Sequence, residues 1–158
     1  MQKISPCLWF DGKAEEAMNF YLGVFKNSKV SDVMRYGNAG PGPKGSVLSC
    51  IFELEGQEFI ALNGGPMFSF TPAISMFVRC DTQEEVDAYW AGLTAGGGEE
   101  VQCGWLKDRF GVSWQIVPRV LGTMLQDKDG AKSTRVMQAM LKMKKIDSAG
   151  LRQAYEWQ

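Results

Sequence analysis

The chain has 158 residues, of which 45% are hydrophobic and 22% are charged. This is the balance of an ordinary globular protein, with enough length for one domain or for two half-domains that share a core. The 17 basic and 18 acidic residues give a net charge of −1. That balance excludes the strongly basic surface that binds nucleic acids or anionic membranes, so neither partner is expected.

The termini and the reactive side chains limit the function classes further. No apolar run is long enough to span a bilayer, and the first ten residues lack the layout of a signal peptide, which predicts a cytoplasmic protein. The sequence contains no histidine, the usual general base and the commonest metal ligand. The four cysteines have no C-x-x-C spacing and fall in strand-like runs, so we expect reduced, structural thiols. They are Cys7, Cys50, Cys80 and Cys103.

Residues 1–66 have the pattern of a β-α-β-β-β module. A helix is expected over residues 14–25, because Ala14, Ala17, Met18 and Tyr21 fall at helical spacing. The runs around it have the composition and turn signals of strands. The expected strands are residues 4–10, 29–36, 46–54 and 57–63.

Residues 72–118 repeat this pattern. A strand over residues 73–80 is followed by the capping box TQEE and by a helix that ends at a glycine run, residues 96–98. The segment EEAMNFY of the first helix aligns without gaps on EEVDAYW of the second. Gly56 and Phe59 correspond in the same way to Gly111 and Trp114. The sequence therefore predicts an internal duplication of about 55 to 70 residues.

Residues 119–158 are predicted to form a helical extension, with helices over residues 120–126, 132–144 and 147–157. The middle segment places Val136, Met137, Met140, Leu141 and Met143 on one apolar arc. A methionine-rich face of this kind is typical of a core or a subunit interface, with a ligand groove as the alternative.

The strand over residues 112–117 is the most informative about function. Its alternation places Val112, Trp114 and Ile116 on one face, which we expect to pack under a helix. Ser113 and Gln115 then lie on the opposite face. A strand glutamine needs a hydrogen-bond partner there, which is either a bound ligand or a neighbouring backbone group or water.

Three segments carry a resemblance to a known family: PCLWFDGKAEEAMNFY, FIALNGGPMFSFTPAIS and CGWLKDRFGVSWQIVP. They resemble the vicinal oxygen chelate superfamily of glyoxalase and bleomycin-resistance proteins. Within it they are most similar to the PhnB-like branch, described as the 3-demethylubiquinone-9 3-methyltransferase domain. The resemblance covers nearly the whole chain. It implies an α+β fold of two tandem β-α-β-β-β modules and a small-molecule ligand in the concave cleft between them.

Metal-binding members of that superfamily take one ligand, usually histidine or glutamate, from the first and last strand of each module. Aliphatic side chains cannot coordinate a metal, and a neutral serine is a poor zinc ligand. We therefore expect neither a metal nor another cofactor. The matching positions in this sequence are Ser5 or Cys7, residues 60–62, Ser75 or Phe77, and Gln115.

The resemblance leaves three functions open. The first is a ligand-binding homodimer, although Trp9 could instead pack at the dimer seam and Arg79 could pair with a carboxylate. The second is a metal-independent enzyme that uses Glu53, Glu58, Asp108 or Cys103, with turn chemistry as the alternative role of Asp108. The third is a methyltransferase, although no glycine-rich turn between a strand and a helix is found. The predicted ligand cleft comprises Cys7, Trp9, Phe77, Arg79, Ser113 and Gln115.

Overall fold

The structure is a computed structural model that describes residues 2–157. It divides into two compact units, Met1–Phe70 and Thr71–Gln158. The second unit combines the predicted module of residues 72–118 with the predicted extension of residues 119–158. Met1, the first residue of the first module, and Gln158, the last residue of the extension, lie outside the described residues.

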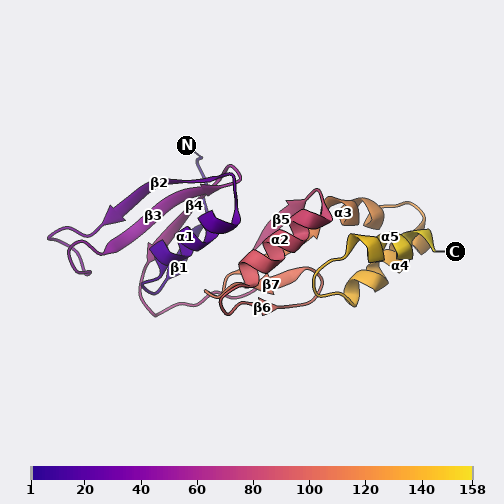
Figure 1. Cartoon of the computed structure of the whole chain (residues 1–158). Helices are drawn as coiled ribbons and strands as arrows, with labels where there is room; N and C mark the ends of the chain where they lie inside the picture. The colour runs from indigo at the N-terminus through magenta and orange to yellow at the C-terminus, as the bar shows by residue number, and fades with distance from the viewer. Residues whose placement is uncertain (1, 158) are drawn as a thin grey trace. The chain divides into compact units, whose positions relative to one another are not determined.

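The first unit is a four-stranded sheet covered on one face by a helix (Figure 1). The strand order is β1-β4-β3-β2, with β1 parallel to β4 and the other neighbours antiparallel. This is the predicted β-α-β-β-β sequence of elements. Its bounds are β1 (Cys7–Phe10), α1 (Ala14–Val24), β2 (Ser28–Arg35), β3 (Val47–Leu54) and β4 (Gln57–Asn63).

The core of the first unit lies between α1 and the sheet. Ala14, Ala17, Met18 and Tyr21 of α1 are all buried, as their helical spacing predicts. On the sheet, buried and partly exposed residues alternate along β3, so that only one face belongs to the core. The apolar stripe of the helix and the buried face of the sheet thus meet as the two layers of an α+β module.

The second unit repeats this arrangement with the strand order β5-β8-β7-β6, in which β5 is parallel to β8. In both units the first strand of the module pairs in parallel with the last, which confirms the predicted duplication. The hydroxyl of Thr82 accepts a hydrogen bond of 3.2 Å from the Glu85 amide and caps α2, as the TQEE motif predicts. The elements are β5 (Ser75–Cys80), α2 (Gln83–Thr94), β6 (Glu99–Glu100), β7 (Trp105–Lys107) and β8 (Ser113–Pro118).

The extension forms three helices with a small core of their own. The helices are α3 (Arg119–Leu125), α4 (Gly130–Leu141) and α5 (Ser148–Glu156). Part of the methionine-rich arc belongs to this core, because Met140 and Met143 pack against it, whereas Met137 and Leu141 remain exposed. The buried residues of the cluster are Leu121, Met124, Val136, Ile146 and Leu151.

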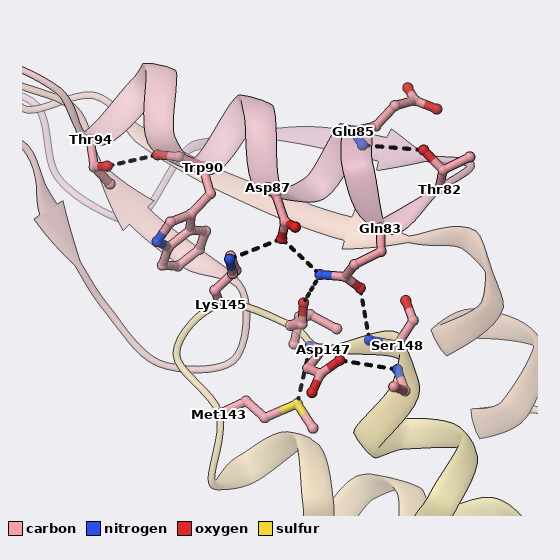
Figure 2. Close-up of polar contacts among 12 residues, drawn as sticks. Thr82, Gln83, Glu85, Asp87, Trp90, Thr94, Met143, Lys145, Asp147 and Ser148 are labelled. Carbon is pink, nitrogen blue, oxygen red and sulfur yellow. Dashed lines mark hydrogen bonds and ion pairs between the residues drawn. The ribbon is translucent and has the colours of Figure 1, made fainter.

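The extension is attached to α2 through side chains of Gln83 and Asp87 (Figure 2). The amide nitrogen of Gln83 donates to Asp87 Oδ1 and to the Ile146 carbonyl, each at 3.0 Å, and its oxygen accepts from the Ser148 amide at 2.8 Å. Lys145 Nζ lies 2.9 Å from Asp87 Oδ1. Side-chain contacts from α2 therefore fix the segment that leads into α5.

Backbone hydrogen bonds attach the same segment to the turn before β7. The amides of Cys103 and Gly104 donate to the carbonyls of Met143 and Lys144, each at 2.8 Å. Cys103 lies in this turn with a φ of 59°, so its prediction as a strand residue was wrong. Its left-handed backbone directs the amide toward the extension rather than along a sheet. Cys7, Cys50 and Cys80 lie in strands, as expected.

Candidate functional site

The two faces of β8 differ in burial as its alternation predicts. Val112, Trp114 and Ile116 are buried, and α2 packs against this strand. Gln115 points to the other side of the sheet and is partly exposed. The face opposite α2, here called the open face of the second sheet, is therefore where a ligand can reach the strand.

Three side chains from three strands form a row on this open face. Gln115 of β8 is the register partner of Phe77 on β5 and of Trp105 on β7. The next register row, which includes the buried Trp114 and Leu106, belongs to the opposite face. The row therefore places an amide between two aromatic side chains.

The amide of Gln115 is oriented by a neighbouring strand. Its nitrogen donates a hydrogen bond of 3.0 Å to the Ser75 hydroxyl, so part of its hydrogen-bonding capacity is satisfied by a side chain. The sequence had suggested a backbone group, a water or a ligand. Within residues 2–157 its carbonyl oxygen accepts no hydrogen bond. The row therefore offers one hydrogen-bond acceptor, the side-chain oxygen of Gln115, to a molecule on the open face.

Arg79 adds a cation to the same face. It lies two residues after Phe77 on β5, and its guanidinium carbon is 5.0 Å from the Phe77 ring centroid. At this distance the guanidinium of Arg79 and the ring of Phe77 form a cation–π contact. Both side chains are exposed.

Ser113 lies on the same side of β8 but is only 3% exposed. Its register partners are Ser75 and Lys107 on the neighbouring strands. The structure thus brings Phe77, Arg79 and Gln115 together on an accessible surface, whereas Ser113 is buried.

The first sheet presents Cys7 and Trp9 on its own face opposite α1. Their register partners on β4 are Ile60 and Leu62, so this face is more aliphatic than its counterpart in the second unit. Burial raises the pKa of the Cys7 thiol, although the residue is exposed overall.

Trp9 also has a structural function within the first unit. Its indole nitrogen donates to the Gly65 carbonyl at 2.8 Å, and its ring meets Phe68 edge to face at 5.1 Å. A Cβ atom at Gly64 would lie 2.5 Å from the ring, so only glycine allows this approach. Trp9 thus holds the segment that follows β4.

Asp108 is a structural residue, which confirms its interpretation as turn chemistry. Its Oδ1 accepts from the amides of Phe110 and Val112 at 2.9 and 3.0 Å. Its Oδ2 accepts from the indole nitrogen of Trp114 at 2.9 Å. At 3% exposure, a carboxylate with these three donors orders the turn and the start of β8 rather than serving as an acid or base.

The remaining acid–base candidates are Glu53, Glu58 and Cys103. Glu53 forms an ion pair of 3.0 Å with Lys29 and lies opposite Glu58 in the strand register. Cys103 lies in the turn before β7. Among the other thiols, burial, assisted by Glu85 and Asp81, raises the pKa of Cys80 to about 12. A thiol of this kind is not ionised near neutral pH and is a poor nucleophile.

The residues at the superfamily's metal positions do not fit a divalent ion. In the first unit the thiol of Cys7 lies beside the aliphatic Ile60, and in the second the hydroxyl of Ser75 is bonded to the neutral amide of Gln115. In the described part of the chain, no group of three or more histidine, cysteine, aspartate or glutamate side chains is arranged to hold a metal. The same residues include no helix long and apolar enough to cross a membrane.

The repeated strand order defines the class of protein as the glyoxalase/bleomycin-resistance fold. The fosfomycin resistance protein FosX from Listeria monocytogenes is similar at a TM-score of 0.52 and 17% identity, over 72% of this chain and 90% of that one. A protein from Pseudomonas aeruginosa has a TM-score of 0.61 at 19% identity, over 74% and 96% of the two chains. At these identities the likeness shows the fold alone.

Residues 2–117 match the 3-demethylubiquinone-9 3-methyltransferase family, and the chain belongs to it. A putative 3-demethylubiquinone-9 3-methyltransferase from Bacillus cereus, described as a PhnB protein, is 41% identical with a TM-score of 0.68. That similarity covers 74% of this chain and 99% of the other. No curated protein matches the chain. The family match ends at residue 117, so α3, α4 and α5 lie outside it.

Sequence reasoning missed Trp105 as a member of the row. It lies in a strand of three residues, too short for its alternation to be read from the sequence. The available signal was its position two residues after Cys103, in the segment that leads to the predicted strand of Gln115. Only the pairing of β7 with β8 shows that the two side chains share a face.

Proposed function

We propose that the protein binds a small, planar and amphipathic molecule on the open face of its second sheet, without a metal ion. The observation that carries this proposal is the row in which Gln115 lies between Phe77 and Trp105. Aromatic side chains next to a few fixed polar groups are typical of small-molecule sites.

Each member of the row has a distinct role in this proposal. The two aromatic rings supply apolar contact area at a small entropic cost, because each has only two side-chain torsions. The free carbonyl oxygen of Gln115 accepts a hydrogen bond from the ligand, while Ser75 holds the amide in place. Arg79 recognises an aromatic ring or a negative group at the edge of the site.

The other residues of the predicted cleft enter the proposal more weakly. Cys7 and Trp9 lie on the corresponding face of the first sheet, and Ser113 is buried. Their contact with a ligand stays a prediction, as do the homodimer and the cytoplasmic location. A monomer in size-exclusion chromatography with light scattering would contradict the predicted homodimer.

The family description favours a second candidate, a methyltransferase, because the Bacillus cereus relative also has that putative name. The glycines of residues 96–98 follow α2 and precede β6, so they do not form the strand-to-helix turn that usually cradles S-adenosylmethionine. Calorimetry with S-adenosylmethionine tests this candidate. Absence of heat at millimolar concentration removes it.

The decisive experiment combines native mass spectrometry with a ligand screen. The spectrum of the protein as purified reports its subunit count, any metal and any retained small molecule. Aromatic compounds are then screened by the movement of the Trp105 indole signal in a ¹H–¹⁵N spectrum. A stoichiometric divalent metal would overturn the metal-free part of the proposal.

Gln115→Leu is the variant that tests the row. It removes the acceptor but keeps a side chain of similar size, so we expect the protein to fold and to bind the selected compound about tenfold more weakly. Gln138→Leu makes the same change on the exposed surface of α4 and is the matched control. Unchanged affinity of Gln115→Leu would show that the ligand does not use this face.

A further inference from the structure

A cavity in the first unit has the size and chemistry of a second binding site. Its volume is about 580 Å³, which lies within the range of small-molecule pockets. It is formed by the start of α1, by the end of β2 with the loop that follows, and by the end of β4. None of the residues of the predicted cleft lines it.

The loop that closes this cavity is held by contacts that require glycine. Tyr36 packs against Gly40 and Gly42, and a Cβ atom at Gly42 would lie 2.2 Å from the Tyr36 ring. The Tyr36 backbone bonds the loop's other end through the amide of Gly45 and the carbonyl of Ser46, at 2.8 and 2.9 Å. The loop therefore forms an ordered wall, with the Tyr36 ring as its largest apolar surface.

The opposite wall is fixed by Asn63. Its Oδ1 accepts from the Ala14 amide at 2.9 Å, and its Nδ2 donates to the Val47 carbonyl at 3.1 Å. These bonds use both ends of the amide and fix the first turn of α1 relative to β3 and β4. Glu15 is consequently held in the cavity lining.

Two opposite charges lie side by side in the lining. Arg35 Nη2 is 3.0 Å from Glu15 Oε2, and Arg35 Nη1 donates to the Gly45 carbonyl at 3.2 Å. Glu15 Oε1 and Arg35 Nε form no hydrogen bond with other residues of the described chain. The pair is about half exposed, so it contributes little to stability and can rearrange around a ligand at small cost.

We propose that this cavity binds a small zwitterion, an α-amino acid with an apolar side chain. Glu15 and Arg35 are the charged residues of the lining, and their formal charges cancel. A ligand with a single charge would pair with one of them and repel the other, whereas an adjacent ammonium and carboxylate satisfy both. Tyr36, Pro41, Pro43 and Val47 provide the apolar surface for the side chain.

The test compares three probes with the same ring: L-phenylalanine, 3-phenylpropionate and 2-phenylethylamine. In ¹H–¹⁵N titrations of the full chain, L-phenylalanine is expected to bind at least about tenfold more tightly than either singly charged probe. Its shifts are expected at the lining residues, including Glu15, Tyr36 and Gly64. No saturable shift at millimolar concentration, or equal binding of a singly charged probe, would overturn the proposal.

Two variants separate the charges. Glu15→Gln leaves Arg35 alone and is expected to shift the preference to 3-phenylpropionate, whereas Arg35→Gln is expected to shift it to the amine. Glu16→Gln makes the same charge change one residue along α1, outside the lining, and should leave the order of the probes unchanged. The same spectra report whether each variant is folded. Identical preferences in all the variants would contradict recognition by the Glu15–Arg35 pair.

The proposed function of the second unit does not affect this test. Gln115→Leu should retain the shifts at the cavity, because it lies in the other unit. If L-phenylalanine instead moves the Trp105 indole signal alone, the cavity proposal fails and the row on the second sheet is the site.

Discussion

The two modules carry the same fold but differ in how the corresponding positions are used. In the first unit Phe59, three residues after the turn glycine, stacks on Phe52 at 5.7 Å within an apolar core. In the second, Trp114 occupies the equivalent position and donates its indole N–H to the buried Asp108. At this position the helix-covered face carries a stacked aromatic pair in one module and a buried polar network in the other.

The open faces differ more strongly than the covered ones. The middle of the first sheet presents Ile51 and Ile60, which are register partners, whereas the second presents Gln115 between two aromatic rings. Packing against a helix restricts substitutions on the covered face, because interiors tolerate few changes of volume. The open face is free of that restriction, so the side chains of the two copies differ there more than on the covered face.

The largest difference in stability between the modules is expected on substitution of the residue three positions before each turn glycine. These residues are Asp108, before Gly111, and Glu53, before Gly56. Asp108→Ala removes the carboxylate that accepts from the buried N–H groups of Val112 and Trp114, and should lower the free energy of unfolding by about 3 to 4 kcal/mol. The equivalent Glu53→Ala removes a surface ion pair with Lys29 and should cost less than about 1 kcal/mol. Urea unfolding of the two variants measures both values.

A milder substitution is available if Asp108→Ala does not fold. Asp108→Asn retains one acceptor oxygen, so its loss of stability should fall between those of the other two variants. Equal losses for Asp108→Ala and Glu53→Ala would show that the polar network does not distinguish the modules.

A smaller difference is expected at the two helix starts. Thr82→Ala removes a local cap from α2 and should cost about 1 kcal/mol. Asn63→Ala removes two bonds that join α1 to the rest of its unit, and should cost about 2 kcal/mol. Hydrogen exchange of the first-turn amides in α1 and α2 measures these effects separately. A larger loss for Thr82→Ala than for Asn63→Ala would show that the bonds of Asn63 to Ala14 and Val47 do not dominate the stability of the start of α1.

The smallest effect on stability is expected at Asp87. The aligned residue of α1 is Met18, so the first unit has no carboxylate at this position. Hydrogen bonds from Lys145 and Gln83 lower the pKa of Asp87 below 3.8. Its contribution to stability is therefore present above that pH and is lost as the pH falls through the lowered value. Asp87→Asn should cost at most about 1 kcal/mol at neutral pH, since the carboxylate is exposed.

Thermal unfolding at a series of pH values checks this expectation. The midpoints of the wild type and of Asp87→Asn should converge as the pH falls through the lowered pKa of Asp87. Asp32→Asn on β2, an exposed change in the first unit, is the matched control. A constant gap between wild type and Asp87→Asn at all pH values would show that the charge of Asp87 does not stabilise the attachment of the extension.

Regular periodicity made much of the fold predictable. The spacing of Ala14, Ala17, Met18 and Tyr21 located the first helix, and the alternation around Trp114 assigned both faces of β8. The similar segments in the two helices indicated the duplication, which the repeated strand order confirms. These features depend on local sequence and on burial, which a period of 3.6 or 2 reports directly.

The candidate site was only partly predictable because it depends on pairing between distant segments. Gln115 and Phe77 could be assigned to a face, but the register that puts them beside Trp105 is set by three strands together. Gln83 looked like an ordinary residue of a capping box, yet it bonds Ile146, 63 positions later. No periodic pattern in the sequence encodes contacts of that separation.

The position of Leu151 in the core of the extension has a consequence for the order of events during synthesis. The first unit finds all the strands of its sheet within residues 7–63, so it can fold while later parts of the chain are still being translated. The second unit closes its C-terminal cluster only after Ile146 and Leu151 have left the ribosome. Until then, Leu121 and Met124 of α3 lack the apolar contacts that bury them in the complete chain.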